Sequence, residues 1–84
     1  MAFEILDLTE FLDNGIAAEA FFMEAARRFD WSRYEGKNVL VKGCGLSVVP
    51  PWAYMIITAR LTRIARSIRY GNDHDNLVVY RQPR

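Results

Sequence analysis

Residues 38–71 read NVLVKGCGLSVVPPWAYMIITARLTRIARSIRYG and carry the pattern of a strand, a helix and a second strand. Residues 38–42 form a short apolar run followed by glycine, which is typical of a strand covered on both faces. Two prolines then favour the start of a helix, which we expect over residues 51–66. Residues 67–71 predict the next strand. Strands joined through a helix run parallel, with a right-handed crossover.

The flanking residues extend this unit. Residues 16–29 are rich in Ala, Glu and Arg and predict a helix, whose expected apolar stripe is Ala18, Phe22, Ala25 and Phe29. Residues 9–12 also look helical, whereas residues 3–8 fit either a short strand or the approach to a helical turn. Residues 77–80 predict a final strand. We therefore expect an α/β fold with a small mixed sheet, a βαβ crossover, helices packed on the sheet and an N-terminal helix preceding the core.

Length and composition indicate one globular domain over residues 1–84. The chain is 51% hydrophobic and 25% charged, which excludes intrinsic disorder, and its one cysteine excludes an internal disulfide. The first residues lack the basic start of a signal peptide, and no apolar run approaches the roughly 20 residues of a membrane span. We expect a cytoplasmic protein that does not insert into membranes.

Charge is divided unevenly along the chain. Residues 1–36 carry eight acidic and three basic side chains, a net charge of −5. Residues 37–84 carry two acidic and eight basic side chains, a net charge of +6. This division favours complementarity within the chain or between subunits. The total of +1 argues against a dedicated nucleic-acid binder, because such proteins are usually basic overall.

The first half of the helix expected at 51–66 is apolar nearly all round. One stripe, the expected core face, consists of Ala53, Ile57, Leu61 and Ile64. The opposite side is also apolar and consists of Trp52, Met55, Ile56 and Ala59. A helix that is apolar on all sides is normally buried on all sides. The second side is covered by the helix at 16–29, by a second copy of the chain with Trp52 and Met55 as anchors, or by a ligand.

The second half of that helix carries arginines at every third residue. Arg60, Arg63 and Arg66 are followed by Arg69, and this spacing distributes them around the end of the helix. Such cations complement the helix dipole. The alternatives are a site for an acidic partner or a phosphate, and, less favoured, a nucleic-acid site.

The loop after residues 38–42 is the candidate for chemistry, and it comprises Lys42, Gly43, Cys44 and Gly45. In open α/β sheets, ligands bind beyond the carboxyl ends of the strands. A nearby lysine and helix N-terminus lower a thiol pKa, which suits a nucleophile, a redox thiol or a soft-metal ligand. A metal site would have to combine Cys44 with His74 and with Asp73 or Asp75 from another loop. The remaining alternative is an incidental thiol.

Two runs of residues carry a resemblance to a known family. The first reads Asp30-Trp31-Ser32-x-Tyr34-x-Gly36-Lys37-x-Val39, and the second, after Cys44, reads Val49-Pro50-x-Trp52-Ala53-Tyr54-Met55. Over residues 16–71 the chain resembles a bacterial family of uncharacterised proteins, domain of unknown function 2480. The resemblance loosely implies an accessory role in iron–sulfur cluster assembly, with Cys44 as the matching thiol. It implies no established activity or catalytic residue.

Two functions follow as hypotheses. The first, favoured over an enzyme, is a binding or adaptor protein that acts as a homo-oligomer and can bind a protein partner. The second is a thiol-dependent accessory protein that handles a metal, a persulfide or an iron–sulfur cluster through Cys44. No motif identifies a cofactor, so the cofactor stays unknown.

Overall fold

The computed structural model of the chain describes residues 3–13, 16, 18–42 and 49–83. Its elements in chain order are β1 (Glu4–Asp7), η1 (Leu8–Phe11), α1 (Glu19–Arg28), η2 (Trp31–Tyr34), β2 (Asn38–Lys42), α2 (Pro51–Leu61), β3 (Ser67–Gly71) and β4 (Asn76–Arg81). The two η elements are single 3-10 turns.

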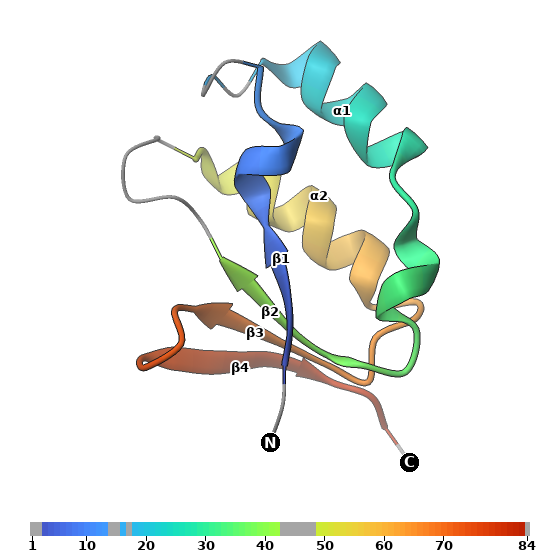
Figure 1. The fold of residues 1–84 in the computed structure, drawn as a ribbon, viewed down its shortest axis with the longest axis vertical. Helices are drawn as coiled ribbons and strands as arrows, with labels where there is room; N and C mark the ends of the chain where they lie inside the picture. The colour runs from blue at the N-terminus through green and yellow to red at the C-terminus, as the bar shows by residue number, and fades with distance from the viewer. Residues whose placement is uncertain (1–2, 14–15, 17, 43–48, 84) are drawn as a thin grey trace.

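The strands form one mixed sheet in the order β1-β2-β3-β4. β1 and β3 run parallel to β2, and β4 runs antiparallel to β3. Each parallel pair is joined through a helix, α1 in the first crossover and α2 in the second. Both helices lie on the same face of the sheet (Figure 1). The expected small α/β fold with a βαβ crossover is confirmed.

The segment at residues 3–8, which the sequence pattern left open, contains β1. Leu6 in this strand is aligned with Val41 of β2 and is completely buried. The helix expected to precede the core therefore lies inside a first crossover, with a strand of the sheet ahead of it. The four-residue strand begins and ends on an acid, so it has too short an apolar pattern to be recognised without its partner β2.

Both helices are shorter than expected. α1 begins at Glu19 rather than residue 16, so Ala18 is an exposed cap residue and Ala26 takes a buried position beside Phe22. α2 ends at Leu61 rather than Arg66, because the chain then turns toward the sheet. The turn is held by two backbone hydrogen bonds to the segment before β2. The Arg66 N–H donates to the Lys37 carbonyl at 2.8 Å, and the Gly36 N–H donates to the Ile64 carbonyl at 2.8 Å.

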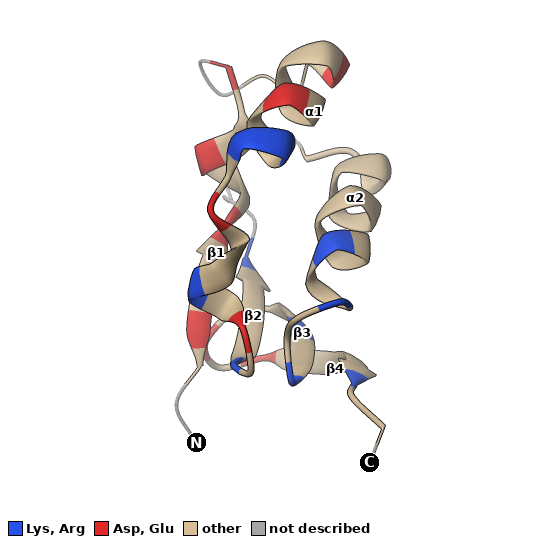
Figure 2. Ribbon diagram, turned by 90° about the vertical axis from the view of Figure 1, so that its right-hand side faces the viewer, with Lys and Arg blue, Asp and Glu red and all other residues tan. Residues whose placement is uncertain are grey.

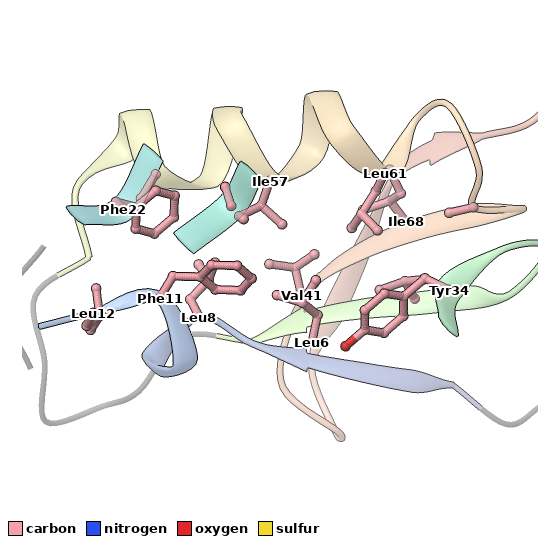
Figure 3. Close-up of a cluster of buried hydrophobic side chains, with 14 residues drawn as sticks. Leu6, Leu8, Phe11, Leu12, Phe22, Tyr34, Val41, Ile57, Leu61 and Ile68 are labelled. Atoms are coloured by element: carbon pink, nitrogen blue, oxygen red, sulfur yellow. The ribbon is translucent and has the colours of Figure 1, made fainter. Parts of the chain in front are cut away.

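The core lies between the sheet and the helical layer. Leu6 and Val41 project from the sheet, Ile57 and Leu61 come from α2, and Phe22 comes from α1 (Figure 3). All five are at most 2% exposed. Three of the four residues of the predicted α2 core stripe are buried, and the fourth, Ile64, packs against the core at partial exposure.

The opposite face of the sheet has no helix over it in the described part of the chain, and we call it the bare face. One row across this face consists of Ile5, Leu40, Arg69 and Val78, which are aligned on neighbouring strands. The Arg69 guanidinium lies 5.2 Å from the centre of the Phe3 ring and donates a 3.0 Å hydrogen bond to Asn76 Oδ1. Leu40 is only 1% exposed although it belongs to this row.

Candidate functional site

The apolar side of α2 is covered in part by α1. The Trp52 ring meets the Phe22 ring edge-on, with ring centroids 5.4 Å apart, and Trp52 packs against the core. Ile56 is also partly buried against the core. Met55 is 72% exposed and Ala59 is exposed. The sequence left three alternatives for covering this side: the helix at 16–29, a second copy or a ligand. The first of these, α1, covers Trp52 and leaves Met55 exposed.

A shallow groove of about 470 Å³ runs along the junction of the two helices. Met23 of α1 lines one side, Ile56 and Ala59 of α2 line the other, and Arg60 and Arg63 lie at its basic end. Figure 2 shows both acidic and basic segments on α1, and a basic segment near the end of α2. The groove thus combines an apolar floor with two cations, a combination that suits an acidic amphipathic partner.

The predicted anion site is divided in space. Arg60 and Arg63 line the groove between the helices, whereas Arg66 lines a polar depression with Asn38, Ser67 and Arg81. Arg69 lies over Phe3 on the bare face of the sheet. The turn after Leu61 separates these side chains, since it carries the chain from the helical layer into the sheet. The structure does not bring the arginines together around one anion.

Two arginines of α1 are paired with one carboxylate. Glu24 on α1 accepts hydrogen bonds from Arg27 at 2.8 Å and from Arg28 at 2.7 Å. These bonds, those from Arg27 first, lower the pKa of the Glu24 carboxyl. The Glu24–Arg28 pair is spaced i, i+4, an arrangement that stabilises an exposed helix slightly.

The thiol candidate lies largely outside the described residues. Gly43, Cys44 and Gly45 fall in the range 43–48, and Lys42 is the last residue of β2. His74 is exposed in the β3–β4 turn, where its backbone N–H donates to Asn72 Oδ1 at 2.9 Å. Among the described residues, no group of three His, Cys, Asp or Glu side chains could hold a metal ion. The hypotheses that rest on Cys44 stay predictions.

The exposed edge position of strand β4 is a feature that sequence reasoning missed. The strand is an edge of the sheet, yet Leu77, Val78 and Val79 are 56%, 39% and 47% exposed. Ile68 of β3 is aligned with Tyr80 and Arg69 with Val78, so Val79 is an extra, bulged residue. The run Leu77-Val78-Val79-Tyr80 was visible as a strand, but its edge position depends on the strand order.

An apolar pocket of about 430 Å³ lies between α2 and the last two strands. Its walls include Val41, Val49, Pro51, Tyr54, Thr58, Ile68, Tyr70 and Val79. The Tyr54 and Tyr70 rings meet at 86° with centroids 5.0 Å apart. The pocket is close to the carboxyl ends of β2 and β3 and to the start of α2, which is where open α/β sheets bind ligands.

None of the helices in the described part of the chain is long and apolar enough to cross a membrane. No curated protein and no solved structure matches the chain. A family profile matches residues 2–82, which include all four strands and both helices. The chain belongs to the family described as "Protein of unknown function (DUF2480)", as its two sequence runs indicated.

Proposed function

We propose that the protein is a small binding or adaptor protein that works as a homo-oligomer, and that β4 is the strand through which two copies associate. The observation that carries this proposal is the exposure of three consecutive apolar residues, Leu77 to Val79, on an edge strand. An exposed apolar edge strand offers unpaired backbone groups and apolar side chains to another strand. Proteins normally protect such edges.

The apolar side chains of β4 are available on both faces of the sheet. Leu77 is aligned with Tyr70, which lines the pocket beneath α2, and Val78 is aligned with Arg69, which lies on the bare face. A strand that pairs with this edge would therefore cover apolar surface above and below the sheet. The bulge at Val79 limits how long a regular ladder along the edge can be. Side-chain burial then contributes more than backbone pairing.

Charge complementarity supports a second copy as the occupant of this edge. Asp73 and Asp75 precede β4, and Arg81 is its last residue. When two copies of β4 pair antiparallel, the acidic start of each strand lies beside the basic end of the other. Two-fold symmetry repeats this contact. Parallel pairing would instead place like charges together.

The groove between α1 and α2 provides an adaptor with a separate surface for its partner. Met23 is 47% exposed there, and Met side chains adapt to different apolar partners. This surface faces away from the sheet. Self-association through β4 leaves it accessible.

The test is sedimentation velocity of the purified protein over a range of micromolar concentrations. We expect the wild type to associate as its concentration rises. Val78→Lys should shift the chain to monomer, because lysine on an edge strand opposes pairing. The matched control is Met55→Lys, which places the same charge on a highly exposed residue of α2.

Each result has a definite meaning once circular dichroism shows that both variants are folded. A monomeric wild type at tens of micromolar overturns the oligomer. An oligomer that survives Val78→Lys but dissociates with Met55→Lys overturns the assignment to β4 and moves the interface to α2.

A further inference from the structure

We propose that the pocket between α2, β3 and β4 binds an uncharged small molecule that carries an aromatic or aliphatic ring and one hydrogen-bonding group. This site adjoins the interface at β4, because Val79 lines the pocket. Pockets for small molecules in proteins range from about 300 to 1,000 Å³, and this one measures about 430 Å³. It is large enough for a ligand of two fused rings.

The walls of the pocket favour a ring. Val41 and Ile68 come from the sheet, and Pro51 comes from the first turn of α2. The Tyr54 and Tyr70 rings meet at 86°, so they form two perpendicular faces of one corner. A planar ring placed in that corner can stack on one tyrosine and present its edge to the other, which are the preferred arrangements of aromatic pairs.

The polar groups of the pocket favour an uncharged ligand. Its described side chains supply hydroxyls, from Tyr54, Tyr70 and Thr58. Burial first, and then hydrogen bonding with Tyr70, raises the pKa of the Tyr54 phenol, so this hydroxyl stays neutral at physiological pH. Neutral hydroxyls orient a ligand through one hydrogen bond and do not compensate the desolvation of a charge.

The one arginine at the pocket directs its charge elsewhere. Arg69 belongs to β3, and its guanidinium lies 5.2 Å from the Phe3 ring and 3.0 Å from Asn76 Oδ1. Phe3 lies two residues before Ile5, and Asn76 lies two residues before Val78. Because side chains alternate along a strand, Phe3 and Asn76 belong to the bare face of the sheet. Arg69 therefore lines the helix-facing pocket with its backbone, while its guanidinium lies on the other face of the sheet. A carboxylate or phosphate ligand would find no cation among these lining side chains.

The probes for the test are 2-naphthol and 2-naphthalenesulfonate, which share the fused rings and differ in charge. Titrations are followed by amide NMR spectra of the full chain. We expect saturable shifts with 2-naphthol, centred on Val41, Tyr54, Thr58 and Tyr70, and binding at least about tenfold weaker for the sulfonate. Absence of saturable binding by 2-naphthol overturns the proposal, and so does equal binding of the sulfonate.

Two variants test the location. Thr58→Phe fills the pocket from α2, and Val49→Phe fills it from its rim. Each should weaken 2-naphthol at least about tenfold, since added bulk excludes the ring. Met55→Phe adds the same ring on an exposed part of α2 and should leave binding unchanged. If both filled variants are folded and bind like the wild type, the site is not this pocket.

Repeating the titration with Val78→Lys separates this inference from the proposed oligomer. Val78 does not line the pocket, so the variant should bind 2-naphthol like the wild type, whatever its oligomeric state. Loss of binding in a folded Val78→Lys variant would show that the site needs the second copy, and would overturn a pocket within one chain.

Discussion

The Phe22 ring of α1 stands edge-on to the Trp52 ring of α2, with centroids 5.4 Å apart and planes at 87°. This contact joins the helices of the two crossovers. Phe22 also packs against Phe11 at 5.5 Å, so it links α1 to the turn that follows β1. One fully buried side chain thus connects three segments that are distant in sequence. Phe22 also covers part of Trp52, one of the residues of the interface predicted on α2.

Phe22→Ala is expected to destabilise the protein by about 3–5 kcal/mol, since it leaves a cavity between α1, α2 and η1. The neighbouring Phe21 is 45% exposed and makes a matched control. Phe21→Ala should cost less than about 1 kcal/mol. Urea denaturation measures both, and a similar cost for the two variants would contradict the role given to Phe22.

Gly71→Ala is expected to destabilise the β3–β4 connection strongly. Gly71 has φ of 140°, and a Cβ there would lie 2.3 Å from the Asp75 carbonyl oxygen and 2.8 Å from Asn76 Cα. Both neighbours are backbone atoms, so the turn itself would have to move.

Gly36 provides the comparison for this variant. Its φ is 71°, but a Cβ there meets no atom within 4 Å. Gly36→Ala should cost about 1–2 kcal/mol from the backbone conformation alone. Thermal or urea unfolding should rank Gly71→Ala as the less stable variant, and the reverse order would contradict the steric argument.

Tyr34 should make stability fall in alkaline solution. Its side chain is completely buried, and its hydroxyl donates to the Ile5 carbonyl at 3.3 Å. Burial, the largest effect, raises the pKa of this phenol above its usual value near 10. The unfolded phenol therefore ionises first. The stability that the neutral Tyr34 phenol contributes is complete below pH about 10, and it is lost as pH rises through the folded-state pKa.

Tyr34→Phe isolates this effect. The variant should be about 1 kcal/mol less stable near neutral pH, because the Ile5 carbonyl loses its hydrogen bond. Its stability should then fall less steeply than that of the wild type above pH about 10. Urea denaturation at several pH values measures the difference. Parallel pH profiles for the two proteins would contradict the raised pKa.

Reversing charges at the two ends of β4 should test antiparallel self-association. Asp75→Arg or Arg81→Asp alone should weaken the dimer, because each places like charges together in the antiparallel arrangement. The double variant restores opposite charges and should recover most of the lost affinity. Sedimentation velocity at low and moderate salt measures this. Additive losses in the double variant would contradict the arrangement.

Local sequence patterns were sufficient for the two strands of the second crossover and for the start of its helix. β2 and β3 cover the same residues that the apolar runs at 38–42 and 67–71 predicted. The start of α2 at Pro51 was likewise predicted from the proline pair. These features depend on residues that are neighbours in the chain, on glycine and proline at the boundaries and on a short apolar period.

Contacts between distant segments determined the rest. β1 is a strand because Leu6 pairs beside Val41, thirty-five positions later in the numbering. α2 ends at Leu61 because Arg66 must reach the Lys37 carbonyl, and that turn separates Arg60 and Arg63 from Arg66. The exposure of β4 follows from the strand order. The amino-acid pattern alone specified which segments form a helix or a strand. The packing of the layers specified which of their side chains meet, since that depends on non-local pairing.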